Sequence, residues 1–264
     1  MKIRVLVLLG CGLFGFLPAH AQDIAAICAD RPGKGTSACT VPAGRAQLEL
    51  GLFDESFLHR SGVTTASGSI LAVLAKTGVS DFLDVEAGFS LYQFEREHGL
   101  GRTMMNGGAG DLFLRAKYNP LAGAGRLAFV FDPYIKIPTA GAAIGNRAME
   151  GGLQLPLLYD LGGGWSFAAT PEADLLRNQS GSGMHANLVN VAGLGLSLES
   201  GITLGAELWT NQNFDPSGTI RQYSADVDAA ILLDKQTQLD GGLNFGLNRV
   251  TPDVEIYFGI SKML

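Results

Sequence analysis

The sequence has few charged residues and, after residue 21, no long apolar run. Asp, Glu, Lys and Arg make up 17% of the 264 residues, whereas hydrophobic residues make up 47%. The lack of any further run of about 18 uncharged apolar residues excludes a transmembrane helix. The formal net charge of −6 argues against nucleic acid, or an anionic membrane surface, as a partner. Such a chain fits a membrane β-barrel, and a secreted soluble β protein is the alternative.

The apolar run at the start of the sequence has the features of an export signal. Two basic residues precede an apolar stretch over 5–17, and residues 19–21 (AHA) form a small-x-small cleavage site. This pattern predicts a signal peptide over residues 1–21. A lipoprotein signal at Cys11 is the alternative, but the apolar run continues well past that cysteine.

Cysteine is also scarce, with three in the chain, of which Cys28 and Cys39 follow the predicted signal peptide. In an oxidising compartment they either form a disulfide worth about 3 kcal/mol or stay as two free thiols. The absence of CxxC or histidine spacing excludes a metal site there. We expect residues 22–43 to be a periplasmic N-terminal segment with a local Cys28–Cys39 clamp, ahead of a barrel over 44–264.

Glycine, in contrast, is abundant at 36 of 264 residues, and the rest of the chain alternates between apolar and polar positions. The stretch GDLFLRAKYNP (110–120) has leucines on one parity and charges on the other, which is the period of a β-strand. The same count predicts about twelve antiparallel strands. They cover residues 47–53, 70–77, 83–92, 110–120, 127–137, 150–157, 165–174, 186–198, 202–209, 223–231, 239–248 and 254–261.

The connections between these strands alternate in length, except that the link over 249–252 is short where a long one is due. The short ones cover 78–81, 160–164, 199–201 and 234–236, and the long ones cover 54–68, 95–107, 138–147, 178–185 and 212–220. Tight turns on one rim and longer loops on the other are typical of an all-β, antiparallel transmembrane β-barrel. A Greek-key sandwich gives no reason for this alternation. We also expect a bulge or break at Pro133, which removes a ladder donor.

In each predicted strand, every second position carries polar residues, and these positions supply the candidate functional residues. Tyr92 and Trp209 occupy such positions, together with a set of charged side chains that we expect to line the lumen. That set is Glu49, Lys76, Asp84, Glu86, Asp111, Arg115, Lys117, Lys136, Glu150, Glu172, Asp174, Glu207, Asp226, Asp228, Asp240 and Glu255. Internal ion pairing that plugs and stiffens the barrel is one interpretation, and a pore lining that sets selectivity is the other.

Catalytic and cofactor motifs are weak. In HRSG (59–62), His59 and Ser61 share a strand face, as in outer-membrane phospholipases, but Gly62 replaces the asparagine usual there. His98 and His185 lie in predicted loops without metal-ligand spacing. The glycine runs lack the GK[ST] of a phosphate-binding loop, so we expect no cofactor and no enzyme activity.

Several phrases spread over the chain resemble a known family. They are DRPG (30–33), VPAGRAQLELG (41–51), GDLFLRAKYN (110–119), YIKIPT (134–139), IGNR (144–147) and TPDVEIYFGIS (251–261). The sequence resembles the outer-membrane transporter family of the MetA pathway of phenol degradation. The resemblance implies an outer-membrane barrel that carries hydrophobic or aromatic compounds, and it brings no catalytic residues. The chain departs from the usual aromatic C-terminal residue, since it ends in Leu264.

The sequence therefore predicts a channel or transporter for small, hydrophobic or aromatic molecules in the outer membrane of a Gram-negative bacterium. A plugged structural or adhesive barrel is the alternative, and an outer-membrane lipase is a weaker one. The expected partners are outer-membrane lipid, a small solute and the barrel-insertion machinery. About twelve strands give a narrower lumen than that of 16-stranded porins.

Overall fold

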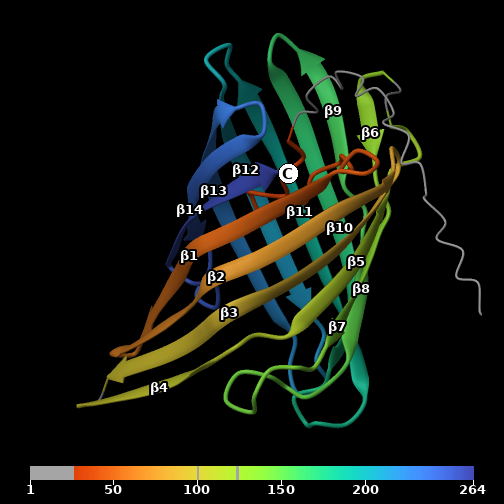
Figure 1. Ribbon diagram of the computed structural model, residues 1–264. Helices are drawn as coiled ribbons and strands as arrows, with labels where there is room; N and C mark the ends of the chain where they lie inside the picture. The colour runs from red at the N-terminus through yellow and green to blue at the C-terminus, as the bar shows by residue number, and fades with distance from the viewer. Residues whose placement is uncertain (1–26, 100, 123–124) are drawn as a thin grey trace, which may run out of the picture.

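The computed structural model describes residues 27–99, 101–122 and 125–264, which form one antiparallel β-barrel (Figure 1). No helix in these residues is long and apolar enough to cross a membrane. The strands are β1 (Ala46–Arg60), β2 (Val63–Ser80), β3 (Leu83–Gly99), β4 (Arg102–Gly108), β5 (Leu112–Tyr118), β6 (Leu127–Phe129), β7 (Asp132–Ile137), β8 (Glu150–Gln154), β9 (Leu157–Gly162), β10 (Trp165–Arg177), β11 (Met184–Ser197), β12 (Ile202–Asn213), β13 (Ile220–Asp234), β14 (Thr237–Gly246) and β15 (Val254–Met263).

The fifteen strand segments close into a twelve-stranded barrel, as the sequence predicts. Each of the twelve positions around the barrel is called here a stave. Three staves are interrupted and consist of β4 with β5, β6 with β7, and β8 with β9. The first and last strands, β1 and β15, pair with each other, and β10 pairs with β11. Closure gives every spanning strand two neighbours, which removes the unpaired edge that a membrane does not tolerate.

Two of the interruptions correct the predicted strands. The stave over 127–137 breaks at 130–131, two residues before the expected position at Pro133. The stave over 150–157 breaks at Pro156, which has no N–H to donate to a ladder. The two breaks face each other, because the backbone N–H of Val130 donates to the carbonyl oxygen of Pro156 at 2.9 Å.

The long loops predicted over 54–68 and 95–107 are wrong. In both places the strands run on as hairpins, paired up to Arg60↔Val63 in β1–β2 and to Gly99↔Arg102 in β3–β4. The hairpins project past the rest of the barrel in Figure 1. Both of their faces carry polar residues, so the alternation that reveals a half-buried strand is lost. The other long connections, over 138–149, 178–183 and 214–219, lack strand structure.

The predicted inward position of Tyr92 is also wrong, because the inside–outside alternation reverses near the middle of β1–β3. The register of β1 against β15 shifts between Gly51 and Phe53, which marks a bulge. In β3, Gln93 instead shares a face with Ser90, to whose Oγ its amide donates at 3.4 Å. Tyr92 is left 36% exposed on the other face.

The outer face of the barrel is apolar. Exposed side chains on the spanning strands include Leu114, Leu194, Leu208, Val227 and Phe258, and the short turns add Phe82, Tyr118, Tyr159 and Trp165. Phe82 and Tyr118 pack edge to face with their ring centroids 6.1 Å apart. An apolar band with aromatic residues at its border is typical of the lipid-facing surface of a membrane barrel. Polar residues are therefore turned inward.

Candidate functional site in the barrel lumen

A segment that we expected to lie ahead of the barrel, before the first strand, lies inside it. Residues 28–41, called here the lumen loop, enter from the rim of short turns, reach farthest at Lys34 and return to that rim. At the rim the hydroxyl of Thr40 donates to the carbonyl oxygen of Asp81 at 3.0 Å. The expectation that 22–43 lies ahead of the barrel is thus wrong for residues 28–41, which lie inside it. Residues 22–26 lie outside the described part of the chain.

A disulfide joins the two arms of the lumen loop. Cys28 and Cys39 are bonded, with their Cα atoms 5.9 Å apart. Cys28 is also tied to the wall, because its N–H donates to Oε1 of Gln47 at 2.9 Å. The amide of Gln47 donates back to the carbonyl oxygen of Cys28 at 2.7 Å. The disulfide thus sets the shape of a loop that contacts the barrel interior, rather than a clamp ahead of the barrel.

One wall, formed by β2, β3 and β5, holds the lumen loop by buried cations. Lys76 and Lys117 point inward, with Nζ atoms 2.9 Å and 2.5 Å from the carboxylate oxygens of Asp30. Arg115 approaches the same carboxylate at 3.8 Å. Both lysine side chains are fully buried. A buried ammonium needs an opposite charge within contact distance, so Asp30 is an integral part of this cluster.

Carboxylates of the wall complete the cluster. Glu49 accepts from Lys76 at 2.6 Å, and its oxygens also accept the backbone N–H of Asp30 at 3.0 Å. Glu86 lies 3.5 Å from Nζ of Lys117 and 3.7 Å from Nζ of Lys76. Three cations thus share carboxylates from both the wall and the lumen loop. This network is the internal ion pairing that the sequence suggested, with the loop as an additional participant.

A second part of the wall, formed by β12, β14 and β15, is acidic and takes the cations of the lumen loop. Arg31 Nε donates to Asp240 at 2.9 Å, and Lys34 Nζ donates to Glu255 at 2.7 Å. The backbone N–H of Lys34 donates to Glu207 at 2.8 Å. The loop therefore turns its acid toward the basic wall and its bases toward the acidic wall. This charge complementarity explains why the loop lies inside.

A third contact holds the far side of the lumen loop. The N–H of Thr36 donates to Oγ1 of Thr170 at 3.2 Å, and its hydroxyl donates to Gln154 at 2.6 Å. The amide of Gln154 in turn donates to Glu172 at 3.2 Å. On the return arm, the N–H of Val41 donates to Asp84 at 2.7 Å. The loop thus contacts the barrel all round its circumference.

Other predicted lumen residues lie inside the barrel without touching the lumen loop. Asp174 accepts from the hydroxyl of Tyr134 at 2.8 Å. Asp226 accepts from the hydroxyl of Ser224 at 3.1 Å. Asp228, on the same strand as Asp226, borders a cavity beside the loop. These carboxylates leave the middle of the lumen with an excess of negative charge.

Three of the candidates form a separate group nearer the long-loop rim. Lys136 lies 2.6 Å from Glu150 and 3.3 Å from Asp111. Asp111 also accepts the N–H of Ala140 at 2.7 Å. This group fixes the connection over 138–149 at the mouth of the barrel. It belongs to the architecture of the rim and not to the cluster around Asp30.

Sequence reasoning missed the residues that the lumen loop contributes. Asp30, Arg31 and Lys34 lie before the first strand, where strand parity says nothing about their position. The available signal is that charges of both signs stand between two cysteines, in DRPGKG. Asp132 was also left out of the candidates although it lies on the lumen parity, and its carboxylate is 3.7 Å from Arg115.

Open space remains on both sides of the lumen loop. A cavity of about 270 Å³ lies between the loop and the wall near Glu49 and Arg115, and one of about 220 Å³ lies toward Gly195 and Gly205. A third, of about 570 Å³, opens at the long-loop rim between Gln93 and Ile144. The loop therefore narrows the lumen without filling it.

A family profile described as "Putative MetA-pathway of phenol degradation" matches residues 29–262. The chain belongs to this family. Among solved structures, the COG4313 outer membrane channel from Pseudomonas putida F1 is similar at a TM-score of 0.69 and 16% identity, covering 89% of this chain and 99% of that one. The NanC porin is similar at a TM-score of 0.53 and 9% identity, over 80% and 100%. The β domain of the Bordetella autotransporter BrkA is similar at 0.55 and 15%, over 84% and 100%. No curated protein matched the chain.

This family member shows no catalytic arrangement at the HRSG motif. Ser61 and Gly62 form the turn of the β1–β2 hairpin, and Nδ1 of His59 lies 2.9 Å from the hydroxyl of Thr64. The lipase hypothesis therefore gains no support from the geometry. Within the described residues, no group of three or more His, Cys, Asp or Glu side chains is arranged to hold a metal ion.

His185 is not the solvated loop residue that the sequence suggested. It is buried in β11, and its Nδ1 lies 3.0 Å from Asn178 and 3.4 Å from the carboxylate of Asp215. Asp215 accepts hydrogen bonds from the hydroxyl of Ser217 and the N–H of Gln179, which lower its pKa to about 2. These contacts join the connections over 178–183 and 214–219 at the long-loop rim.

Proposed function

We propose that this protein is an outer-membrane channel for small molecules, with hydrophobic or aromatic compounds as its solutes. The observation that carries the proposal is a closed, lipid-compatible barrel whose lumen is narrowed, but not filled, by a loop held through ion pairs. Cavities lie on both sides of the loop, and we infer that small solutes pass through this space. The family description and the likeness to an outer membrane channel support the same conclusion.

The alternative is a plugged barrel with a structural or adhesive role. The buried contacts of Asp30 with Lys76 and Lys117 favour it, since they fix the loop in the lumen. The two functions differ in one measurable property. A channel conducts ions or releases solutes when it is reconstituted, whereas a permanent plug does neither.

Reconstitution into liposomes and planar bilayers tests the proposal. We expect single-channel events of small conductance, and release of small entrapped solutes but not of solutes the size of a trisaccharide. Boiled and unheated samples of the same preparation are run side by side on a gel. A difference in mobility between them shows that the barrel is folded. A folded barrel that gives neither conductance nor solute release refutes the channel function.

We also propose that the protein reaches the outer membrane through a signal peptide over residues 1–21 and the barrel-insertion machinery. The apolar outer face, with Tyr118 and Trp165 at its border, suits outer-membrane lipid as the surrounding partner. Membrane fractionation tests this point. Mature protein found in the soluble periplasmic fraction, without a heat-dependent shift on the gel, contradicts the proposal.

A further inference from the structure

The acidic half of the lumen wall has no basic residue of its own in the middle of the barrel. Strands β10 and β12–β15 present Glu172, Asp174, Glu207, Asp226, Asp228, Asp240 and Glu255. The basic residues in these five strands, Arg177, Arg221 and Lys262, lie at or next to the strand ends. The cations that neutralise this half come from the lumen loop, through Arg31 and Lys34. A solute that passes the loop therefore meets a wall of negative charge.

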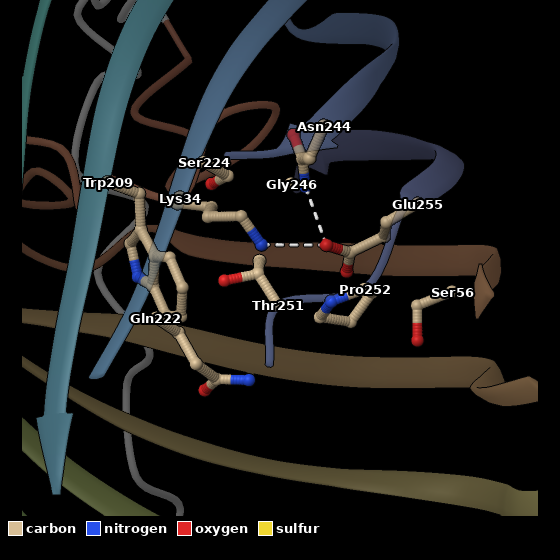
Figure 2. A pocket seen from close by; sticks show the side chains of 10 residues that line it. All are labelled: Lys34, Ser56, Trp209, Gln222, Ser224, Asn244, Gly246, Thr251, Pro252 and Glu255. Carbon is tan, nitrogen blue, oxygen red and sulfur yellow. Dashed lines mark hydrogen bonds and ion pairs between the residues drawn. The ribbon is translucent and has the colours of Figure 1, made fainter. Parts of the chain in front are cut away.

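Lys34 shows how this wall binds a primary ammonium group. Its Nζ atom lies 2.7 Å from the carboxylate of Glu255 and 5.0 Å from the centre of the Trp209 ring. Figure 2 shows the ammonium between the indole and the carboxylate. A cation over an aromatic face with a carboxylate beside it is a recognised arrangement for binding alkylammonium ligands. Lys34 belongs to the lumen loop, whereas Trp209 and Glu255 belong to the wall.

The space beside Lys34 is a cavity of about 180 Å³, called here the Trp209 cavity, on the long-loop side of the lumen loop. Its lining includes Gln222, Ser224 and Asn244 besides Trp209 and Glu255. The volume exceeds that of a single water site by about tenfold, so a small organic molecule fits.

Two buried oxygen atoms, one in the lining of this cavity and one beside it, have no hydrogen-bond donor. Asn244 is 3% exposed and its amide donates to Glu255 at 2.7 Å, but its Oδ1 has no partner. Asp226 does not line this cavity, but it pairs with Asn244 in the sheet, is 2% exposed, and its Oδ1 also lacks a partner. Both atoms are acceptors. Buried acceptors without donors are costly, and an ammonium group supplies up to three N–H donors.

We propose that the Trp209 cavity binds the primary ammonium group of an organic solute in place of Lys34, and that the channel therefore prefers small organic cations to anions. Lys34 acts as a built-in competitor that occupies the site until the solute arrives. This inference rests on the proposed channel function and names the solute class. An amine with an apolar skeleton satisfies both the acidic wall and the apolar part of the cavity.

Binding is tested first, by tryptophan fluorescence. The chain has two tryptophans, so Trp165→Phe leaves Trp209 as the sole emitter. We titrate this folded variant in detergent with n-butylammonium chloride, using sodium chloride at equal ionic strength as the reference. We expect a saturable change in emission with butylammonium alone. Adding Lys34→Met removes the competitor and tightens binding by about tenfold, whereas Glu255→Gln weakens it by about tenfold or more. Asp234→Asn, at an exposed turn, is the matched control and leaves binding unchanged.

Selectivity is tested second, in planar bilayers that hold the full mature protein. Reversal potentials across gradients of butylammonium chloride and sodium butyrate give the permeability of cation against anion. We expect the cation to be favoured, and Glu255→Gln to reduce that preference. Conductance without charge preference, together with an unchanged Trp209 emission, overturns the inference and leaves the channel function standing. A complete lack of conductance refutes the channel function, while the titration still decides whether the ammonium site exists.

Discussion

Replacing Asp30 with asparagine should release the lumen loop from the basic wall. The Asp30 carboxylate is the acid that the loop brings to Lys76 and Lys117, at 2.9 Å and 2.5 Å, and both lysines are fully buried. Asparagine keeps the shape of the side chain but removes its charge. Glu49 and Glu86 remain as partners for the two lysines, so the wall retains part of its neutralisation. The barrel itself is therefore expected to stay folded.

The size of the effect follows from the burial of the cluster. Removing one member of a buried ion pair costs about 3–5 kcal/mol when the other charge is left without a partner. Because Glu49 and Glu86 still neutralise the two lysines, the lower end of this range applies. Each 1.4 kcal/mol is a factor of ten in an equilibrium, so a cost of about 3 kcal/mol raises the fraction of molecules with the loop undocked roughly 10²-fold. Arg31 and Lys34 still attract the loop to the acidic wall, which makes release frequent rather than permanent.

Single-channel recording measures this change directly. We expect Asp30→Asn to show larger and longer openings than the wild type, because an undocked loop no longer narrows the lumen. Asp160→Asn is the matched control, since Asp160 is an exposed residue near the end of β9 and its carboxylate accepts only the N–H of Gly162 among the described contacts. If the Asp30 variant runs as a folded barrel on the gel and yet conducts like the wild type, the cluster does not hold the loop.

Three further predictions concern the loop and the rims. Replacing Cys28 and Cys39 with serine removes about 3 kcal/mol of loop constraint, so openings become more frequent while the heat-dependent gel shift stays, and unchanged gating contradicts this role. Gly78→Ala places a methyl group against the carbonyl oxygen of Pro42, so the thermal unfolding midpoint falls by several degrees, measured by circular dichroism, and an unchanged midpoint is the contrary result. The pKa of Asp215 is lowered from its ordinary value of 3.8 to about 2, so its tie between the two rim connections is complete above pH 4 and is lost as pH falls through 2. Pepsin cleavage within 214–219 should thus rise only near pH 2 in the wild type, but already at pH 4 in Asp215→Asn.

The alternation of residues predicted most of the barrel wall. In β5, Arg115 and Lys117 fall on one parity and Leu114 on the other, and the structure places the charges inside and the leucine outside. This success has a simple reason, since a strand between lipid and a polar lumen must alternate along its whole length. Where that condition ends, prediction failed. The hairpins over 54–68 and 95–107 extend beyond the band where one face meets lipid, so their pattern resembles that of loops.

Local irregularities marked the second limit of prediction. The reversal that moved Tyr92 to the outer face belongs to a row of irregularities across neighbouring strands. The register shifts at Gly51/Phe53 in β1, and Leu71 in β2 has a positive φ of 54°. The residues next to Tyr92 in the sequence give no sign of this reversal. The break at Pro156 was visible as a proline within a strand, but its partner at Val130 became evident only when both strands were in place.

The sequence by itself determined that the chain is a barrel, because alternate residues must satisfy two different surroundings, and it determined which wall residues are polar. Only the tertiary structure decided what those residues do. Asp30, Arg31 and Lys34 carry no positional signal before the first strand, and they acquire one when Lys117, Asp240 and Glu255 converge from strands far apart in the chain. Charges of opposite sign attract through space and not along the sequence, so the narrowed lumen becomes evident only in the closed barrel.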